Sequence, residues 1–347
     1  MTQTLVSHQK LRRFACKLFE STGLSHPIYD QVVNSLVDTS VRGVDSHGMR
    51  LIPHYLQAII LGRINKNPKF SFKKTAASTG ILDADHGFGI IAGLTAINQA
   101  INLAQKTGIG AVAVKNSSHF AAAAIYSLKA AKTNMIGLSF THTASLVLPF
   151  NGKRPFLGTN PICFCAPIEG EDPFCLDMAT SQVSWNKVLD YKAKNIKLET
   201  GWACDHYGNP TTDPKTAEVL LPMAGYKGYG LALMVEIICS LLTQMPFGHD
   251  IKKMYPVDNQ RRRLGHFFMA LDISKFVSVK IFKKRIKQLC DQLRHEPSVN
   301  GVKVMVPGDP EKITAKNRRK TGIPLSSADI ENFRQIAQNL KVKFSLM

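Results

Sequence analysis

A chain of 347 residues with 44% hydrophobic and 20% charged residues has the size and composition of an ordinary globular protein, which excludes disordered and fibrous classes. No uninterrupted apolar run approaches the ~20 residues needed to cross a bilayer, so we expect no membrane segment. The formal net charge of +19 is unusual and brings in one further class, proteins that bind nucleic acid through clustered Lys and Arg.

The N-terminal segment and the cysteines both favour a reducing compartment. The stretch MTQTLVSHQKLRRFACKLF lacks the apolar core of a signal peptide and is typical of an amphipathic helix. The seven cysteines have no CxxC spacing and mostly apolar neighbours. Cys163 and Cys165 can share one face of a strand but have no matching second pair, so we predict no metal site. We expect a cytoplasmic protein with reduced thiols.

The basic excess is concentrated in the C-terminal third of the chain. Residues 251–320 contain 18 Lys plus Arg against 6 Asp plus Glu. Within this region, residues 277–294 interleave apolar and basic residues at helical spacing, which predicts an amphipathic helix with a solvated basic face. This pattern favours simple surface charge, and nucleic-acid binding by the C-terminal third stays the alternative.

The first 61 residues predict a group of helices. Apolar residues recur at helical spacing over residues 7–44, with a break at 21–23 and a restart near 26–27. The loop RGVDSHG follows at 42–48, and another helix is predicted over 52–61. His47 therefore lies between helices, where either a capping loop or a catalytic role is consistent with its small and polar neighbours.

Strands and helices alternate from residue 81 onward. A strand near 81–86 leads to Gly87-Phe88-Gly89 and a helix over 91–106. The third glycine, Gly93, comes one residue late for GxGxxG, and no strand ending in Asp or Glu follows at the ribose-binding distance. The motif is therefore a poor Rossmann fingerprint.

The stretch KNSSHFAAAAIY at 115–126 is the most suggestive part of the chain. A β-rich run over 109–114 precedes it, and its alanines favour a helix. We expect His119 where the strand turns into the helix, a place where free backbone N–H groups can meet an anion. A plain turn with an N-cap is the alternative.

The rest of the chain continues the α/β pattern. Strands are predicted over 135–140, 162–166, 174–178, 265–272 and 302–306, a helix cap at 179–181, an apolar helix over 231–242, and polar helices over 311–347. GYKGYG at 225–230 precedes the apolar helix and forms either an anion cradle or a tight turn, but not a Walker A loop. The alternation predicts an α/β fold.

Several motifs occur together, and in this order, in one family. They are DSHG at 45–48, a histidine after Ser117-Ser118, GTNP at 158–161, DMATS at 177–181, PTTDP at 210–214, KGYG at 227–230, GHFF at 265–268 and PGDP at 307–310. Over residues 5–330 the chain resembles the malate/L-lactate dehydrogenase family of NAD(P)-dependent oxidoreductases. This family also contains ureidoglycolate dehydrogenase and 2,3-diketo-L-gulonate reductase.

The resemblance implies an α/β (α+β) fold that is not a Rossmann fold. A helical domain made from both termini, residues 1–75 and 311–347, would accompany a mixed-sheet α/β domain at 76–310 that binds cofactor and substrate. The implied cofactor is NAD, with NADP possible, and the implied substrate is a small 2-hydroxy or 2-oxo acid of the malate, lactate or ureidoglycolate type. A homodimer is implied, without nucleic acid or membrane partners.

The resemblance also implies the site residues. His47 and His119 match two histidines proposed as proton donor or acceptor, a role that suits a side chain titrating near neutrality. Residues that match nicotinamide-cofactor contacts are Thr143, Asp177, Met178, Ala179, Lys227, Gly308, Asp309 and Pro310. Arg50 is the candidate for the substrate carboxylate, with Ser46 beside it, because a guanidinium binds carboxylate bidentately. Many relatives carry this arginine four residues after the histidine, whereas Arg50 is third.

Overall fold

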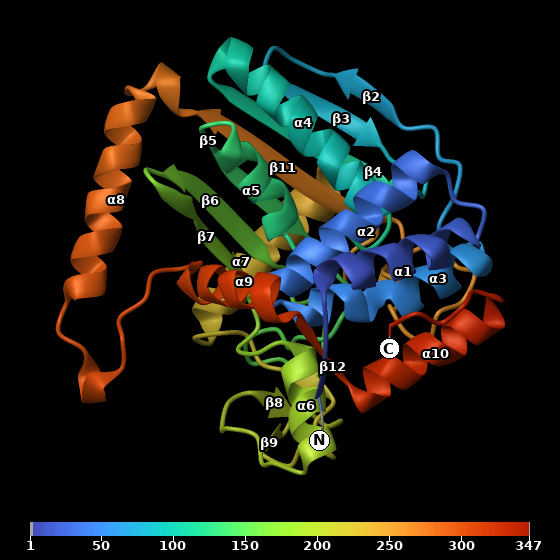
Figure 1. The fold of residues 1–347 in the computed structure, drawn as a ribbon. Coiled ribbons are helices and arrows are strands. Elements are labelled where there is room, and N and C mark those ends of the chain that lie inside the picture. Colours follow the sequence, from blue (N-terminus) through green and yellow to red (C-terminus); the bar gives the residue numbers. More distant parts are fainter. Residues whose placement is uncertain (1–2, 347) are drawn as a thin grey trace.

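A seven-stranded mixed sheet forms the centre of the molecule, which the computed structural model describes over residues 3–346 (Figure 1). Its strand order is β2 (Ser71–Lys74), β3 (Thr79–Asp83), β4 (Ile109–Ser117), β11 (Leu264–Asp272), β5 (Met135–Thr141), β6 (Ile162–Ile168) and β7 (Glu171–Met178). Only β3 and β4 pair in parallel, and the other neighbours are antiparallel. The parallel pair requires a crossover, which α4 (Gly89–Thr107) provides.

Small residues bring α4 and α5 (Ala124–Lys132) close to one face of the sheet. Alanines recur every four residues along α4, at 92, 96, 100 and 104, and all are buried. A Cβ on Gly110 of β4 would lie only 1.9 Å from the carbonyl oxygen of Ala100, so glycine is required at this approach. The other face is covered by α7 (Tyr226–Glu236) and the π-helical turn Ile237–Leu241, which pack on Phe140.

The two ends of the chain meet in one helical core beside the sheet (Figure 1). Its elements are β1 (Gln3–Val6), α1 (His8–Glu20), α2 (His26–Val41), α3 (Ile52–Ile60), β12 (Ile323–Ser326) and α10 (Ser327–Asn339). β1 pairs with β12, and Phe14 of α1 meets Phe333 of α10 edge-on at 6.0 Å. A capping box between Ser326 and Asp329 starts α10. The predicted α/β fold, with helices from both termini beside a mixed sheet, is confirmed; the boundaries at 75 and 310 stay predictions.

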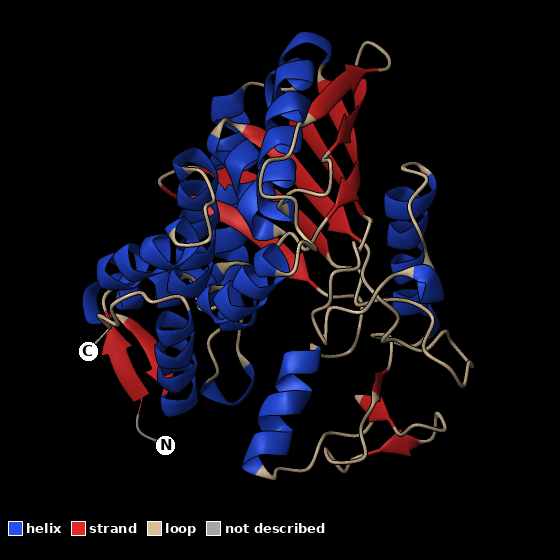
Figure 2. Cartoon of the chain, turned by 90° about the vertical axis from the view of Figure 1, so that its right-hand side faces the viewer, coloured by secondary structure: helices blue, strands red, loops and turns tan. Residues whose placement is uncertain are grey.

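Three further segments complete the fold. A small unit of α6 (Trp185–Lys194), β8 (Ala203–Cys204), β9 (Pro210–Thr211) and β10 (Val219–Leu220) has its own core around Trp202 and lies apart from the large sheet (Figure 2). α8 (Val279–His295) stands at the β6–β7 edge, and α9 (Asp309–Thr321) leads back to the helical core (Figure 1). Within residues 3–346, no helix has the length and apolar character to cross a membrane.

Three local predictions were wrong. Residues 302–306 form no strand: Val302 is 68% exposed and no described strand pairs with this stretch. No helix starts at 179–181, since α6 begins at Trp185 and is capped by Ser184. The stretch 226–230 lies inside α7 instead of preceding it. The amphipathic basic helix predicted over 277–294 is present as α8, with Lys280, Lys284 and Arg285 exposed; Ile281 is also 52% exposed, because the helix stands at the sheet edge and is covered on only part of its surface.

Candidate active site

A cavity of about 1460 Å³ lies between the helical core, the end of the sheet and the small α6 unit. Ten of the twelve predicted site residues line it: Ser46, His47, Arg50, His119, Thr143, Asp177, Met178, Ala179, Gly308 and Pro310. They come from segments far apart in the sequence, so the fold itself assembles the site.

Ion pairing and close packing hold the loop that carries His47. Its two 3₁₀ turns, Asp45–His47 and Met49–Leu51, are joined at Gly48, where a Cβ would lie 2.1 Å from Ser40 Oγ. Arg318 of α9 binds both carboxylate oxygens of Asp45, at 2.6 and 2.9 Å. His47 Nδ1 lies 2.9 Å from Ser46 Oγ, which fixes one edge of the ring.

The loop that carries His119 is held from two sides. On one side His266 Nε2 of β11 lies 2.8 Å from Ser117 Oγ, which ties the end of β4. On the other, Ser118 Oγ accepts from Gly89 N at 2.8 Å and donates to Gly87 O at 2.9 Å. The Gly-Phe-Gly motif therefore packs this loop, and α5 begins only at Ala124, beyond the loop.

The two predicted histidines form a pair with a buried tyrosine behind it. The rings of His47 and His119 have centroids 5.9 Å apart and an interplanar angle of 22°. Tyr55 Oη lies 2.9 Å from His119 Nδ1 and donates to the His119 carbonyl oxygen at 3.4 Å, while Ala121 N lies 3.4 Å from the same ring nitrogen. The phenol oxygen can therefore accept from Nδ1–H, and with the ring proton on Nδ1 the lone pair of Nε2 is able to take a proton. Nε2 is then left for the cavity.

Burial keeps these histidines neutral. It lowers the pKa of His47 to about 4 and that of His54, a neighbour of His119, to about 3. The pKa of His119 lies well below its usual value, first because of burial and then because of the charges of nearby groups including His47 and Arg262. Burial also raises the pKa of Tyr55, so its phenol stays protonated. Neutral imidazoles of this kind suit proton acceptance.

The wall expected to bind the cofactor is made by β7 and the loop at 307–310. Asp177 is the last but one residue of β7 and accepts from Ala124 N at 2.9 Å, and burial raises its pKa to about 7. Gly308 has φ 97°, and a Cβ there would lie 3.1 Å from Cys175 N. Opposite this wall, the Thr143 N–H donates to Asn160 Oδ1 at 3.1 Å.

These features fit a dinucleotide. The cavity exceeds the roughly 300–1,000 Å³ of ordinary small-molecule pockets, and a small acid alone would leave much of it unfilled. Its walls offer small side chains and backbone groups for close approach, together with the carboxyl group of Asp177. We find the residues present compatible with a bound nicotinamide cofactor.

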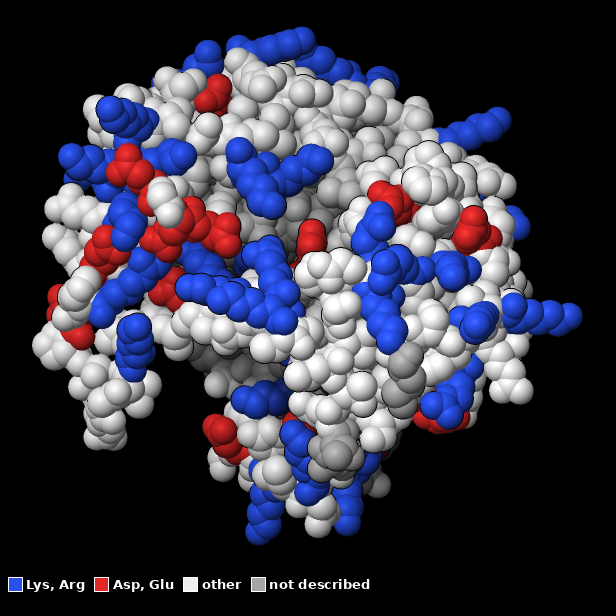
Figure 3. All heavy atoms as spheres, in the orientation of Figure 1, with Lys and Arg blue, Asp and Glu red and all other residues white. Residues whose placement is uncertain are grey.

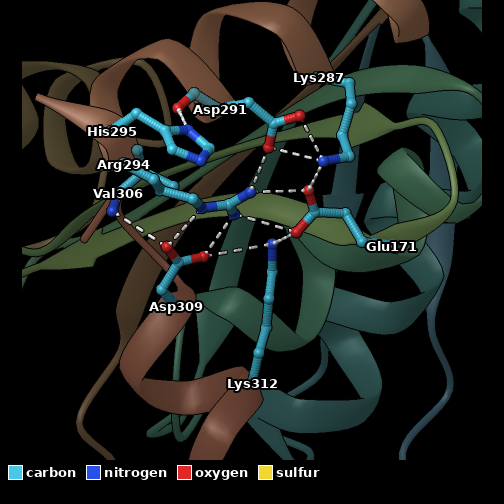
Figure 4. A network of polar contacts seen from close by, with 8 residues as sticks. All are labelled: Glu171, Lys287, Asp291, Arg294, His295, Val306, Asp309 and Lys312. Atoms are coloured by element: carbon cyan, nitrogen blue, oxygen red, sulfur yellow. Dashed lines mark hydrogen bonds and ion pairs between the residues drawn. The ribbon is translucent and has the colours of Figure 1, made fainter. Parts of the chain in front are cut away.

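Two predicted cofactor contacts lie elsewhere. The Asp309 carboxylate binds Arg294 of α8 at 2.9 and 2.7 Å and accepts from Val306 N at 3.1 Å, within a network that Figure 4 shows. Glu171, Lys287, Asp291 and Lys312 complete this network. Asp309 therefore anchors the 307–310 loop. Lys227 is exposed in the first turn of α7 and does not line the cavity.

Arg50 lies at the cavity but is already partly paired. Its Nε is 3.3 Å from the Asp329 carboxylate, and its side chain is 45% exposed. The neighbouring carboxylate offsets part of its charge, which weakens Arg50 as an anion site.

Sequence reasoning missed several residues around the site. Tyr55 and His54 belong to a mostly apolar helix, and their polar atoms within that apolar pattern were the available signal. Arg262 also lines the cavity. It is the middle residue of Arg261-Arg262-Arg263 before β11, and nothing in the neighbouring sequence distinguishes it from the other two arginines. The thiols of Cys163 and Cys165 are joined by that of Cys175, and the three sulfur atoms lie within 4.8 Å of one another. The β6–β7 register, with Cys165 opposite Cys175, creates this buried cluster.

Known proteins share this fold over their whole length. The malate/L-lactate dehydrogenase family model matches residues 6–334. A malate/(S)-sulfolactate dehydrogenase from Methanothermus fervidus is 33% identical over 344 residues, which cover 98% of this chain and 99% of that protein. The ureidoglycolate dehydrogenase (NAD(+)) of Escherichia coli K12 is 32% identical, over 92% of this chain and 90% of that protein.

Solved structures agree with these sequence matches. A malate dehydrogenase from Entamoeba histolytica superposes with a TM-score of 0.93 and 30% identity, over 99% of each chain. A sulfolactate dehydrogenase from Methanocaldococcus jannaschii superposes with a TM-score of 0.91 and 30% identity, over 98% of each chain. Nothing in these comparisons supports nucleic-acid binding, and Figure 3 shows Lys and Arg spread over one face with Asp and Glu among them. The chain therefore belongs to the malate/L-lactate dehydrogenase family of NAD(P)-dependent oxidoreductases.

Proposed function

We propose that this protein interconverts a small 2-hydroxy acid and its 2-oxo acid, with NAD as the hydride carrier and His119 as the group that moves the proton. The observation that carries the proposal is the pairing of His119 with Tyr55 and His47 at one cavity large enough for both cofactor and substrate. The substrate is of the malate, lactate or ureidoglycolate type, in line with the names of the relatives.

In this proposal, some residues of the site transfer the proton and others hold the substrate and the reacting side chains in place. The nicotinamide supplies the hydride chemistry when it is bound. His119 takes the hydroxyl proton during oxidation and returns it during reduction, while Tyr55 holds the other ring nitrogen. His47, backed by Ser46, lies against His119 and keeps the second imidazole at the reacting group. Arg50 and Ser46 are further proposed contacts of the substrate.

The cofactor lies, in this proposal, along Thr143, residues 177–179 and the 307–310 loop. Gly308 and Pro310 line the cavity directly, whereas Asp309 acts by holding their loop on α8. Lys227 is proposed as a cofactor contact from the start of α7, although it is outside the cavity wall of the single chain.

NAD is proposed over NADP because the relative named for NAD(+) matches more of this chain than the relative named for NADP(+) does. The relative named for NAD(+) matches 92% of the chain, and a (2R)-3-sulfolactate dehydrogenase (NADP(+)) from Chromohalobacter salexigens matches 78%. Initial rates with both cofactors at equal concentration test this choice. A kcat/KM for NADPH above that for NADH would contradict it.

We also propose a cytoplasmic homodimer whose helical and α/β domains divide near residues 75 and 310. The seven free cysteines support a reducing compartment. Exposed apolar side chains at the end of α7, in the π-helical turn and just after it support a contact between copies; they are Met234, Ile237, Leu241, Leu242 and Phe247. Light scattering after size exclusion measures the mass, and a Leu241→Asp variant should shift it to that of the monomer. A wild-type monomer would refute the dimer.

The decisive experiment is a substrate panel. Purified protein should oxidise NADH or NADPH with at least one of pyruvate, oxaloacetate or a related 2-oxo acid. His119→Ala should lower kcat far more than it weakens NADH binding, because the ring acts on the substrate proton. No turnover across the panel, from protein that binds NADH, would refute the proposed function; equal loss of kcat and NADH affinity would refute the role of His119.

A further inference from the structure

Arg262 is a buried cation at the wall of the cavity, and its charge has no ion-pair partner in the part of the chain that the structure describes. Only 4% of its surface is exposed, and it lines the same cavity as His119. Its Nε donates to Lys252 O at 3.0 Å, whereas its buried Nη1 has no hydrogen-bond partner. Among residues 3–346, no carboxylate lies within ion-pair distance of its guanidinium. A buried guanidinium left in this state is costly.

The neighbouring Arg63 shows that the same loop can satisfy an arginine fully. Arg63 is 2% exposed, pairs with the Asp258 carboxylate, and donates to the carbonyl oxygens of Asp258 and Met254. These bonds hold the loop before β11 in place, and the Lys252 contact holds the base of the Arg262 guanidinium. The guanidinium of Arg262 is therefore held in place by this loop.

Among the described residues, the surroundings of Arg262 contain no anion to neutralise it. The groups whose charges act on it are Arg63, Tyr55 and Tyr255, and both phenols stay protonated at neutral pH because their pKa values are raised. Burial and Arg63 lower the pKa of Arg262 to about 10, which leaves the guanidinium cationic at pH 7. Its charge in turn lowers the pKa of His119, which places it near the proposed proton-transfer group.

We propose that Arg262 binds the carboxylate adjacent to the reacting carbon of the substrate. A substrate carboxylate bound where Arg262 lines the cavity pairs with the guanidinium and neutralises the buried charge. Arg50 is the weaker candidate, because it is half-exposed and lies 3.3 Å from Asp329. This inference rests on the proposed function, since it assigns the substrate anion to a residue of that site.

The test compares Arg262→Gln and Arg262→Lys with Arg261→Gln, a matched control that removes one exposed arginine from the same loop. NADH binding by fluorescence, oxalate binding to the NADH complex by calorimetry, and KM for pyruvate and oxaloacetate are measured for each. We expect Arg262→Gln to weaken oxalate binding and raise KM by about 10- to 100-fold, with NADH affinity within twofold of wild type. Arg262→Lys should recover part of the loss, and Arg261→Gln should match wild type.

The outcomes separate this inference from the proposed function. Oxalate binding that is equal in Arg262→Gln and Arg261→Gln overturns the inference. A parallel loss of NADH and oxalate binding in both Arg262 variants also overturns it, because that result indicates a structural role. If oxalate binding depends on Arg262 but wild-type protein reduces no 2-oxo acid, the anion site stands and the oxidoreductase proposal fails.

Discussion

Replacing Tyr55 by Phe removes one hydroxyl group from behind the proposed catalytic histidine. The hydroxyl lies 2.9 Å from His119 Nδ1, and the contact that would remain to that nitrogen is the longer one from Ala121 N at 3.4 Å. A neutral hydrogen bond of this kind contributes ~0.5–1.5 kcal/mol, and one to a charged group ~1.5–3 kcal/mol. Since the ring gains charge during oxidation, we expect kcat to fall by about 10- to 100-fold.

The same change should leave cofactor binding and packing nearly intact. Tyr55 does not line the cavity, and a phenylalanine keeps the contact with the Phe88 ring, whose centroid lies 5.7 Å away. Steady-state kinetics and NADH fluorescence titration measure the two effects separately. Tyr29→Phe is the matched control, because Tyr29 is buried in the same helical core but contacts His26 instead. A kcat within twofold of wild type, or an equal loss in both variants, would refute the reasoning.

Three further outcomes follow from the structure. The pKa of His54 is about 3 in the folded protein and ~6.5 in the unfolded chain, so the unfolded chain binds a proton first as the pH falls. The free energy of unfolding should therefore fall by roughly 2 kcal/mol for each such buried histidine between pH 7.5 and 5, with almost all of the loss below pH 7. Urea unfolding should show this loss, and a His54→Gln variant that loses as much stability as wild type would contradict it. Arg294→Gln removes the contacts that tie the 307–310 loop to α8, so it should weaken NADH binding about 3- to 10-fold with kcat nearly unchanged. Arg285→Gln, which changes an exposed arginine of the same helix, should leave NADH affinity unchanged. Equal NADH affinities of the two variants in a fluorescence titration would count against the anchoring role of Asp309. Gly89→Ala puts a Cβ 2.2 Å from Ser118 O, so it should lower the free energy of unfolding by about 1–3 kcal/mol and reduce both the melting temperature and kcat. Gly230→Ala is the control, because a Cβ there meets open space. Similar melting curves for the two variants would disprove the predicted clash.

Local sequence patterns determined most of the elements. Apolar spacing and the closing Gly108, whose φ is 88°, define α4, and β-rich runs define β4 and β5. These features depend on residues a few positions apart, so a single sequence carries them. The ordered set of short motifs also identified the family and ten residues that line the cavity.

Other features arise only from contacts between distant parts of the chain. Tyr55 and His119 are 64 residues apart, and His266 and Ser117 are 149 apart, so no local pattern joins them. The orientation of Asp309 toward Arg294, and away from the cavity, depends on where α8 packs at the sheet edge.

The sequence by itself therefore determined the kinds of elements and the residue types of a dehydrogenase site. The tertiary structure decided which charges are paired and which are not, because a buried ion is defined by everything packed around it. Arg63 and Arg262 show the difference, since Arg63 pairs with Asp258, whereas Arg262 lines the cavity without a carboxylate partner among residues 3–346. Nothing in the letters Arg261-Arg262-Arg263 distinguishes the middle arginine from its exposed neighbours.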